Sequence, residues 1–341
     1  MAKNKFFYVL LSFALSIVLI LVLLSFIDTE DLTKTFTEID YSYLLVFIAI
    51  ALFAAGLRAW RYKLLLYPHS ISWRNIILVT LIRNLFVDLF PARIGSLSYI
   101  YILNKRLNFS FEVATSTFVV AIMFDFLTLS PFLILSIFAV GLGTTAISTL
   151  SLLIFSFLFF LIIFVIFWKI TQISSFLLKI YGLLLKLFKL ESKRWAGMTI
   201  EKFHLTIEYL SKIKKKKIYG RILSLSLLIR LAKYSSLYFL LLSLLRTHGF
   251  TFKNLSFWKN ILGITGAELS SALPIKGIAG FGTWESAWAL TFKLMSFETD
   301  LAILSGIGVH LITNLYEYSL GILAILILTF PLMKKTKNKK N

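Results

Sequence analysis

Long apolar stretches alternate with short polar links along most of this chain. Six of the stretches approach or exceed the length of about 20 apolar residues that a helix needs to cross a bilayer. No small-residue cleavage site follows the first one, so we expect it to be retained as a span rather than removed as a signal peptide. The pattern predicts an all-α integral membrane protein with about six spanning helices, at residues 6–27, 41–66, 111–140, 151–168, 222–245 and 301–330.

Two further apolar stretches are shorter, and each ends at a proline. Residues 75–90 precede Pro91 and residues 258–273 precede Pro274. Each would form about 24 Å of helix, which is marginal for crossing. Broken helices at membrane depth occur only where protein or a wet cavity satisfies the freed backbone groups. Each break therefore predicts a re-entrant helical hairpin beside a transport or binding path.

The basic residues predict the orientation of the spans, because cytoplasmic loops carry an excess of Lys and Arg. Lys3 and Lys5 place the N-terminus in the cytoplasm, and the basic tail at 334–340 places the C-terminus there as well. The acidic link 28–40 then lies outside. We expect a multi-pass protein of the cell membrane whose first hairpin enters from the cytoplasm and whose second enters from outside.

The longest polar segment, at about residues 169–221, is rich in Lys and Arg and includes four consecutive lysines from Lys214 to Lys217. Apolar side chains such as Leu177, Tyr181 and Leu184 recur in it at helical spacing. The segment therefore predicts a cytoplasmic insert of amphipathic helices that lie in the headgroup layer and are attracted to anionic lipid.

The two halves of the chain, at about residues 1–140 and 150–331, have the same order of elements: span, span, hairpin, span. The positive-inside rule gives the two halves opposite orientations. Side-chain identity between them is weak, so the likeness is one of architecture. We predict a single transmembrane domain, residues 1–341, built as an inverted repeat. Inverted repeats with a broken helix in each half are typical of alternating-access carriers.

Composition narrows the class of protein further. Hydrophobic residues make up 58% of the 341 residues and charged residues only 15%, which excludes a soluble globular domain. The net charge of +20 comes from cations gathered in a few links, as at a membrane surface rather than in a nucleic-acid-binding protein. The absence of Cys excludes disulfides and thiolate metal sites. We expect no cofactor and no nucleic-acid partner.

Both breaks carry specific motifs. The first break contains Pro91-Ala-Arg-Ile-Gly95, preceded by Arg83-Asn84-Leu85. The second contains Pro274, followed by Gly280-Phe-Gly-Thr-Trp-Glu285. These motifs resemble two signatures of the flippase-like transmembrane domain of lysylphosphatidylglycerol synthases. The resemblance covers nearly the whole chain. It implies a translocase that moves a polar-headed lipid between leaflets. Because the aminoacyl-transferase domain of those synthases is absent from the sequence, lipid synthesis is not implied.

The sequence departs from that family pattern at both breaks. The first family motif runs Pro-x-Arg-x-Gly-Glu with an Arg a few residues later, whereas Ser96 takes the Glu position and residues 98–101 contain no Arg. In the second break Lys276 adds a cation where the family favours glycine. A role built on the missing Glu is therefore not carried over to this chain.

Charged residues inside the membrane are candidates for function, because each costs about 3 kcal/mol or more at the bilayer centre. Arg93 and Lys276 lie in the breaks, where each would bind a lipid phosphate or cap the carbonyls of its own half-helix. Glu285 would cap the return helix of the second hairpin or contact the ligand. We favour Asp88 and Asp125 as counter-ions of Arg93.

A second group of candidates lies on the last span. His310, Asn314 and Glu317 share one helical face, and Glu268 of the second hairpin is expected to approach it. Hydrogen bonding between helices is the favoured role of this face, and proton coupling is the alternative. Four cations near the span ends are predicted to snorkel to lipid phosphates: Arg58, Arg61, Arg230 and Lys233.

The alternative to a carrier is a membrane-embedded glycosyltransferase or other lipid-modifying enzyme. Asp28, Glu30 and Asp31 would then supply a base or bind metal, but the outside links look too short to fold over a sugar. A channel is disfavoured because no repeated pore-lining ring is found. The sequence favours a translocase whose partners are membrane lipids with anionic headgroups. It leaves open phospholipid, glycolipid or polyprenyl-phosphate cargo, and also the oligomeric state.

Overall fold

The computed structural model describes residues 17–141, 149–215, 218–270 and 277–337. Within these ranges every regular element is a helix, which confirms the all-α fold class. The six helices that are long and apolar enough to cross a membrane are α3 (Tyr41–Leu66), α6 (Phe111–Val140), α7 (Thr149–Trp168), α8 (Ile170–Leu187), α10 (Tyr219–Leu245) and α13 (Thr299–Lys337).

Five of these six helices match predicted spans, and the sixth does not. Half of the predicted span 6–27 lies outside the described residues, and the described half is helical from Ile17 to Leu24. The sixth helix is α8, which belongs to the segment that the sequence assigns to the membrane surface. It follows α7 after the single residue Lys169 and packs against α9 (Arg194–Lys215). The headgroup location of α8 and α9 stays a prediction.

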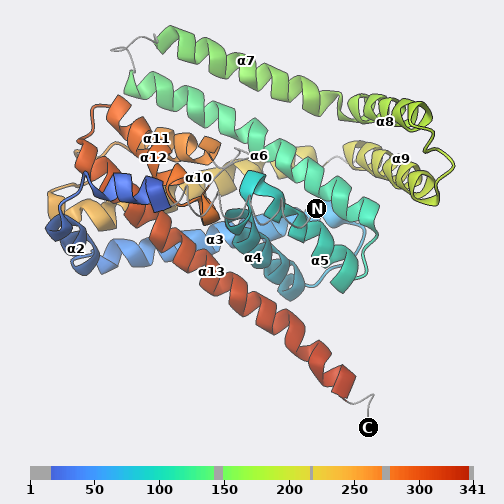
Figure 1. The fold of residues 1–341 in the computed structure, drawn as a ribbon, viewed down its shortest axis with the longest axis horizontal. Helices are drawn as coiled ribbons and strands as arrows, with labels where there is room; N and C mark the ends of the chain where they lie inside the picture. Colours follow the sequence, from blue (N-terminus) through green and yellow to red (C-terminus); the bar gives the residue numbers. More distant parts are fainter. Residues whose placement is uncertain (1–16, 142–148, 216–217, 271–276, 338–341) are drawn as a thin grey trace.

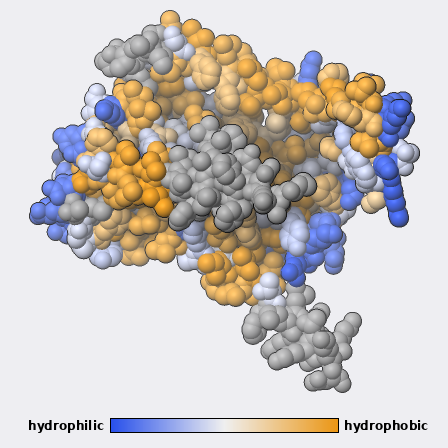
Figure 2. Space-filling view, viewed as in Figure 1, coloured by the Kyte–Doolittle hydropathy of each residue, from blue (hydrophilic) through white to orange (hydrophobic). Residues whose placement is uncertain are grey.

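The surface is hydrophobic in the middle and hydrophilic at two ends. Figure 2 shows hydrophobic side chains over most of the visible face, with hydrophilic ones gathered around α2 (Thr29–Thr37) on the left and around α8 and α9 on the right. Long helices run between these ends (Figure 1). The fold is therefore a helical bundle whose hydrophobic middle suits a bilayer, which makes it a multi-pass membrane protein.

A pair of short helices occupies the place of each predicted hairpin, and the re-entrant nature of these pairs stays a prediction. The first comprises α4 (Trp73–Leu89), the 3₁₀ helix η1 (Pro91–Leu97) and α5 (Ser98–Arg106). The second comprises α11 (Phe257–Ser270), η3 (Ile278–Gly280) and α12 (Thr283–Leu294). The two breaks touch each other, since η1 contacts η3. Entry of the hairpins from opposite sides of a bilayer stays a prediction.

Gly95 allows the first break to fold back tightly on α4. A Cβ atom at this position would lie 1.6 Å from the carbonyl oxygen of Phe86, so any side chain would collide with backbone. Gly280, in the second break, has a φ of +86°, in the left-handed region that glycine enters without strain. The glycines that follow the two prolines thus have a backbone role in each break.

Each hairpin packs against the last long helix of the other half of the chain. Helix α4 contacts α13, α11 contacts α6, and the matching helices α3 and α10 lie along each other. Gly321 brings α13 close to α4, because a Cβ there would lie 2.4 Å from the Cβ of Leu85. The halves therefore form one interlocked body, although the predicted repeat boundaries remain untested.

The orientation can be tested with single cysteines, because the chain has none of its own. Glu38, at the end of α2, and Ser192, between α8 and α9, are both exposed. We expect a membrane-impermeant maleimide added to intact cells to label Glu38→Cys and to leave Ser192→Cys unlabelled until the cells are lysed. Labelling of Ser192→Cys in intact cells would overturn the predicted orientation.

Candidate functional site

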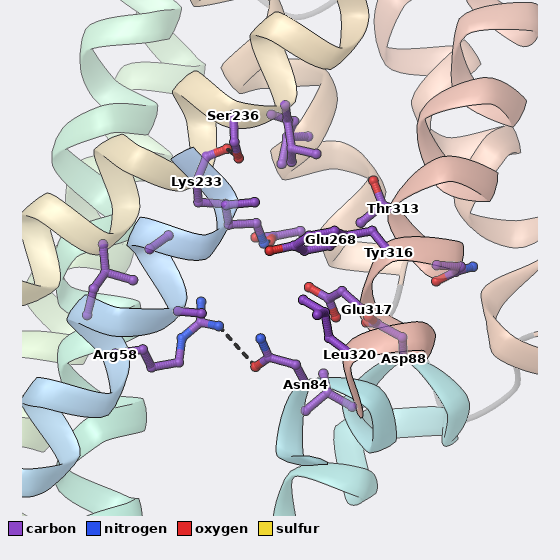
Figure 3. A pocket seen from close by; sticks show the side chains of 18 of the residues that line it. Arg58, Asn84, Asp88, Lys233, Ser236, Glu268, Thr313, Tyr316, Glu317 and Leu320 are labelled. Atoms are coloured by element: carbon purple, nitrogen blue, oxygen red, sulfur yellow. Dashed lines mark hydrogen bonds and ion pairs between the residues drawn. The ribbon is translucent and has the colours of Figure 1, made fainter. Parts of the chain in front are cut away.

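A cavity of about 210 Å³ lies inside the bundle. Its wall comes from both halves: α3, α4 and α6 from the first, and α10, α11, η3, α12 and α13 from the second. Figure 3 shows charged and polar side chains from several of these helices converging on it. A polar cavity enclosed by long apolar helices is the feature that broken helices at membrane depth predict.

A buried ion pair beside the cavity joins Arg61 of α3 to Asp125 of α6. Arg61 donates through Nη1 and Nη2 to the two carboxylate oxygens of Asp125, at 2.6 and 3.3 Å, and its side chain is fully buried. Nη1 also donates to Ser226 Oγ of α10 at 2.9 Å. Arg230 of α10 donates to the backbone carbonyl of Asp125 at 2.5 Å. Three helices are thereby joined around one carboxylate.

A second cluster centres on Glu268 of α11. Its carboxylate is paired with Lys233 and lies 3.5 Å from Nη1 of Arg230, both on α10. Figure 3 shows Lys233 and Glu268 side by side at the cavity. Arg230 therefore connects this cluster to Asp125, and the charged groups form one continuous network.

Two arginines in the cavity wall share a neutral acceptor instead of a carboxylate. Nη1 of Arg58 and Nη1 of Arg83 both donate to Oδ1 of Asn84, at 3.0 and 3.4 Å. No ion pair of either arginine with a carboxylate is found among the described residues. The positive charge of this arginine pair, Arg58 and Arg83, thus faces the cavity without a matching anion.

Several hydrogen-bond donors in the wall also have no acceptor. In the described part of the chain, Arg83 Nε, Thr313 Oγ1, Asn314 Nδ2 and Tyr316 Oη are buried and make no hydrogen bond. Most buried polar groups in proteins are hydrogen-bonded. Four unmatched groups that can all donate, gathered at one cavity, point to a ligand that is rich in acceptors.

The charge balance of the described side chains favours an anionic ligand. Asp88 of α4 and Glu317 of α13 lie near each other in the cavity wall. Around the cavity lie five cations, Arg58, Arg61, Arg83, Arg230 and Lys233, and four carboxyl groups, Asp88, Asp125, Glu268 and Glu317. The surplus is one positive charge even when every carboxyl group is ionised.

His310 reaches the cavity from a buried contact with Glu285. Its Nδ1 lies 2.6 Å from Glu285 Oε1, and the ring stacks on Trp284 with centroids 4.8 Å apart. The other carboxylate oxygen of Glu285 accepts from the Gly282 amide at 2.8 Å. Glu285 is 1% exposed and does not line the cavity. It therefore caps α12, which is one of the two roles that the sequence left open, and holds the His310 ring in position.

Most residues that the sequence singled out are brought together. Asp88, Asp125, Glu268, His310, Asn314 and Glu317 all line the cavity, and Glu268 does approach the polar face of α13. Lys276 and the side chain of Arg93 lie outside the described residues. Their contact with a headgroup, and pairing of Asp88 with Arg93, stay predictions. For Asp125 the structure gives a different partner, Arg61.

The predicted snorkelling of four cations is wrong. Arg58, Arg230 and Lys233 line the cavity, and Arg61 is buried behind it. The reason is that α3 and α10 extend beyond these residues, so that their cations lie on inward faces well inside the helices. The sequence contained a signal for these inward-facing cations. The helices α3 and α10 each carry two cations three positions apart, on one helical face: Arg58 with Arg61, and Arg230 with Lys233.

The acids proposed for the enzyme alternative lie elsewhere. Asp28 accepts from the Glu30 amide and so caps α2, and Glu30 and Asp31 occupy its first turn at one polar end of the bundle. No group of three His, Asp or Glu side chains that could hold a metal ion is found in the part of the chain that the structure describes.

Together these features define an integral membrane protein with a charged cavity that helices from both parts of the chain surround. The family model of the lysylphosphatidylglycerol synthase TM region matches residues 9–321. The chain therefore belongs to this family, which confirms the resemblance seen in its two breaks and supports a role related to membrane lipids. A search of curated proteins finds no match.

The Arg61–Asp125 pair provides a test of the network. We expect Arg61→Ala to lower the free energy of unfolding by about 3–5 kcal/mol, because it leaves the carboxylate of Asp125 inside the bundle without its partner. Adding Asp125→Asn should recover part of this loss. The midpoint of thermal unfolding in detergent would measure both effects.

Lys212→Ala is the matched control for that test. Lys212 pairs with Glu208 on the surface of α9 at 2.7 Å, and both side chains are more than half exposed. We expect no measurable change in the midpoint. Equal effects of Lys212→Ala and Arg61→Ala would contradict a special role for the buried pair.

Proposed function

We propose that this protein is a lipid translocase of the cell membrane, with both termini in the cytoplasm, that moves lipids with polar, anionic headgroups between leaflets. The observation that carries the proposal is the cavity, where a surplus of cations meets buried donors without acceptors. Membership of a family related to lysylphosphatidylglycerol synthases supports a lipid as cargo.

The chemistry of the wall selects the kind of headgroup. A phosphate diester has free acceptor oxygens and one negative charge, which suits Arg58, Arg83 and the unmatched donors of α13. The cavity of about 210 Å³ is smaller than the usual pocket for a whole small molecule, about 300–1,000 Å³. It has room for a headgroup, whereas the acyl chains would stay in the surrounding hydrocarbon.

The arrangement of the hairpins supports movement of that headgroup. The breaks η1 and η3 meet, and Gly280 of η3 forms part of the cavity wall. In an inverted repeat each hairpin would open the site toward one side of the membrane, and alternation of the two open states would carry the headgroup across.

A lipid-modifying enzyme is the second candidate. The observation in its favour is that carboxyl groups and His310 line the same cavity, where a positioned acid or base could act on a bound lipid. Against it, Asp125 and Glu268 are engaged with cations, and His310 with Glu285. A translocated lipid keeps its mass, whereas a modified lipid does not.

The arginine pair gives the decisive test. In reconstituted vesicles we expect Arg58→Gln or Arg83→Gln to slow translocation of a fluorescent anionic phospholipid by roughly 10-fold to 100-fold. This is the loss of one charged hydrogen bond, about 1.5–3 kcal/mol. Accessibility of the labelled headgroup to an external quencher measures the rate.

Arg194→Gln is the matched control, because Arg194 is an exposed arginine on α9 away from the cavity. It should translocate at the wild-type rate. Wild-type translocation by both Arg58→Gln and Arg83→Gln would remove the cavity from the mechanism. Mass spectrometry of the recovered lipid decides between the two candidate functions, since an altered mass would establish the enzyme.

A further inference from the structure

An apolar groove of about 370 Å³ lies on the other side of α4 from the cavity. Three elements supply most of its wall: Ile82, Phe86 and Phe90 from α4 and the link after it, Ile94 from η1, and Ile325 and Leu328 from α13. The rings of Phe86 and Phe90 stack with centroids 5.9 Å apart. Ile94 is 57% exposed, so the groove is open to the surroundings of the bundle.

The groove has a polar end as well as an apolar end. One face of α5 lines it through Ser98, Ile102 and Arg106, which follow one another at successive turns. Tyr101, also in the wall, is 60% exposed. Arg106 lies at the last turn of α5, where the predicted orientation places the cytoplasmic interface, and it has no carboxylate partner among the described residues. A groove that is apolar along its length and cationic at its interfacial end has the shape and charge of an anionic phospholipid.

A close contact between α4 and α13 lies between this groove and the charged cavity. On α4, Leu85 lies between Asn84, which lines the cavity, and Phe86, which lines the groove. Along α13 the order is Ile325 in the groove, Gly321, then Glu317 in the cavity. Leu85 and Gly321 touch each other between the two spaces, so closely that Gly321 has no room for a side chain.

We propose that the groove holds an acyl chain of an anionic phospholipid whose phosphate binds Arg106, and that this lipid waits beside the cavity behind the Leu85–Gly321 contact. The role of the groove as a waiting position rests on the proposed translocase function. Its occupation by lipid rests only on the shape and charge of the groove. Parting of α4 from α13 at that contact would connect the two sites without the chain leaving the hydrocarbon.

Photoreactive lipids test the occupation. The purified protein is placed in phosphatidylcholine vesicles that contain either a phosphatidylglycerol or a phosphatidylcholine with the same diazirine-bearing acyl chain. After illumination, mass spectrometry of peptides locates the adducts. We expect adducts to concentrate on Phe86, Ile94 and Ile325, with more from phosphatidylglycerol than from phosphatidylcholine.

Two pairs of matched variants separate a specific site from general lipid contact. Ile325→Trp fills the groove and should remove these adducts, whereas Leu323→Trp, at a position 52% exposed on the same helix but outside the groove, should not. Arg106→Gln should lower the excess of phosphatidylglycerol adducts roughly 5-fold, as expected for loss of about 1 kcal/mol. Lys105→Gln removes the same charge one residue away, outside the groove, and should keep the excess close to wild type.

The outcomes distinguish this proposal from the proposed function. Adducts spread evenly over lipid-facing positions such as Leu315 and Leu323, or an unchanged phosphatidylglycerol excess in Arg106→Gln, would overturn the groove site even if translocation is observed. Specific groove adducts in vesicles that show no translocation would support the site and overturn the translocase. Loss of both the adducts and translocation in the Ile325→Trp variant would support the waiting position.

Discussion

The cavity depends on the pairing of Arg61 with Asp125. A buried charge inside a membrane protein is tolerated only with a partner, and this pair satisfies two charges while it links α3, α6 and α10. Through Arg230 the same network extends to Glu268 on α11. With these carboxylates engaged, Arg58 and Arg83 are left to share one amide oxygen, and their charge is directed into the cavity.

The interlocked packing of the halves positions this network. Because α4 lies on α13 and α11 lies on α6, each break is supported by the half to which it does not belong. Gly321 permits the close approach of α13 to α4, and Gly95 permits the first break to fold back on α4 within its own half. Because the short helices of each half pack against the other half, both halves contribute to the cavity wall. No single half contributes enough helices to surround the cavity.

Much of the fold could be predicted from the sequence, because apolar length and proline position are local signals. The spans at α3 and α6 and the short helices on either side of each break were predicted in this way. The polar face of α13 was also predicted, from spacing alone. The inward direction of Arg58 and Arg230 was not, because snorkelling and burial depend on which face of a helix packs inward. That is decided by neighbours far away in the sequence, as the contact of α3 with α10 illustrates.

The distribution of ion pairs between the halves bears on how the chain is made. Arg61 and Asp125 both belong to the first half, whereas Glu268 and its partners Arg230 and Lys233 all belong to the second. Synthesis proceeds from the N-terminus, so α3 and α6 can neutralise each other before α10 leaves the ribosome. Each half can therefore match these carboxylates from its own residues, without a cation from the opposite half.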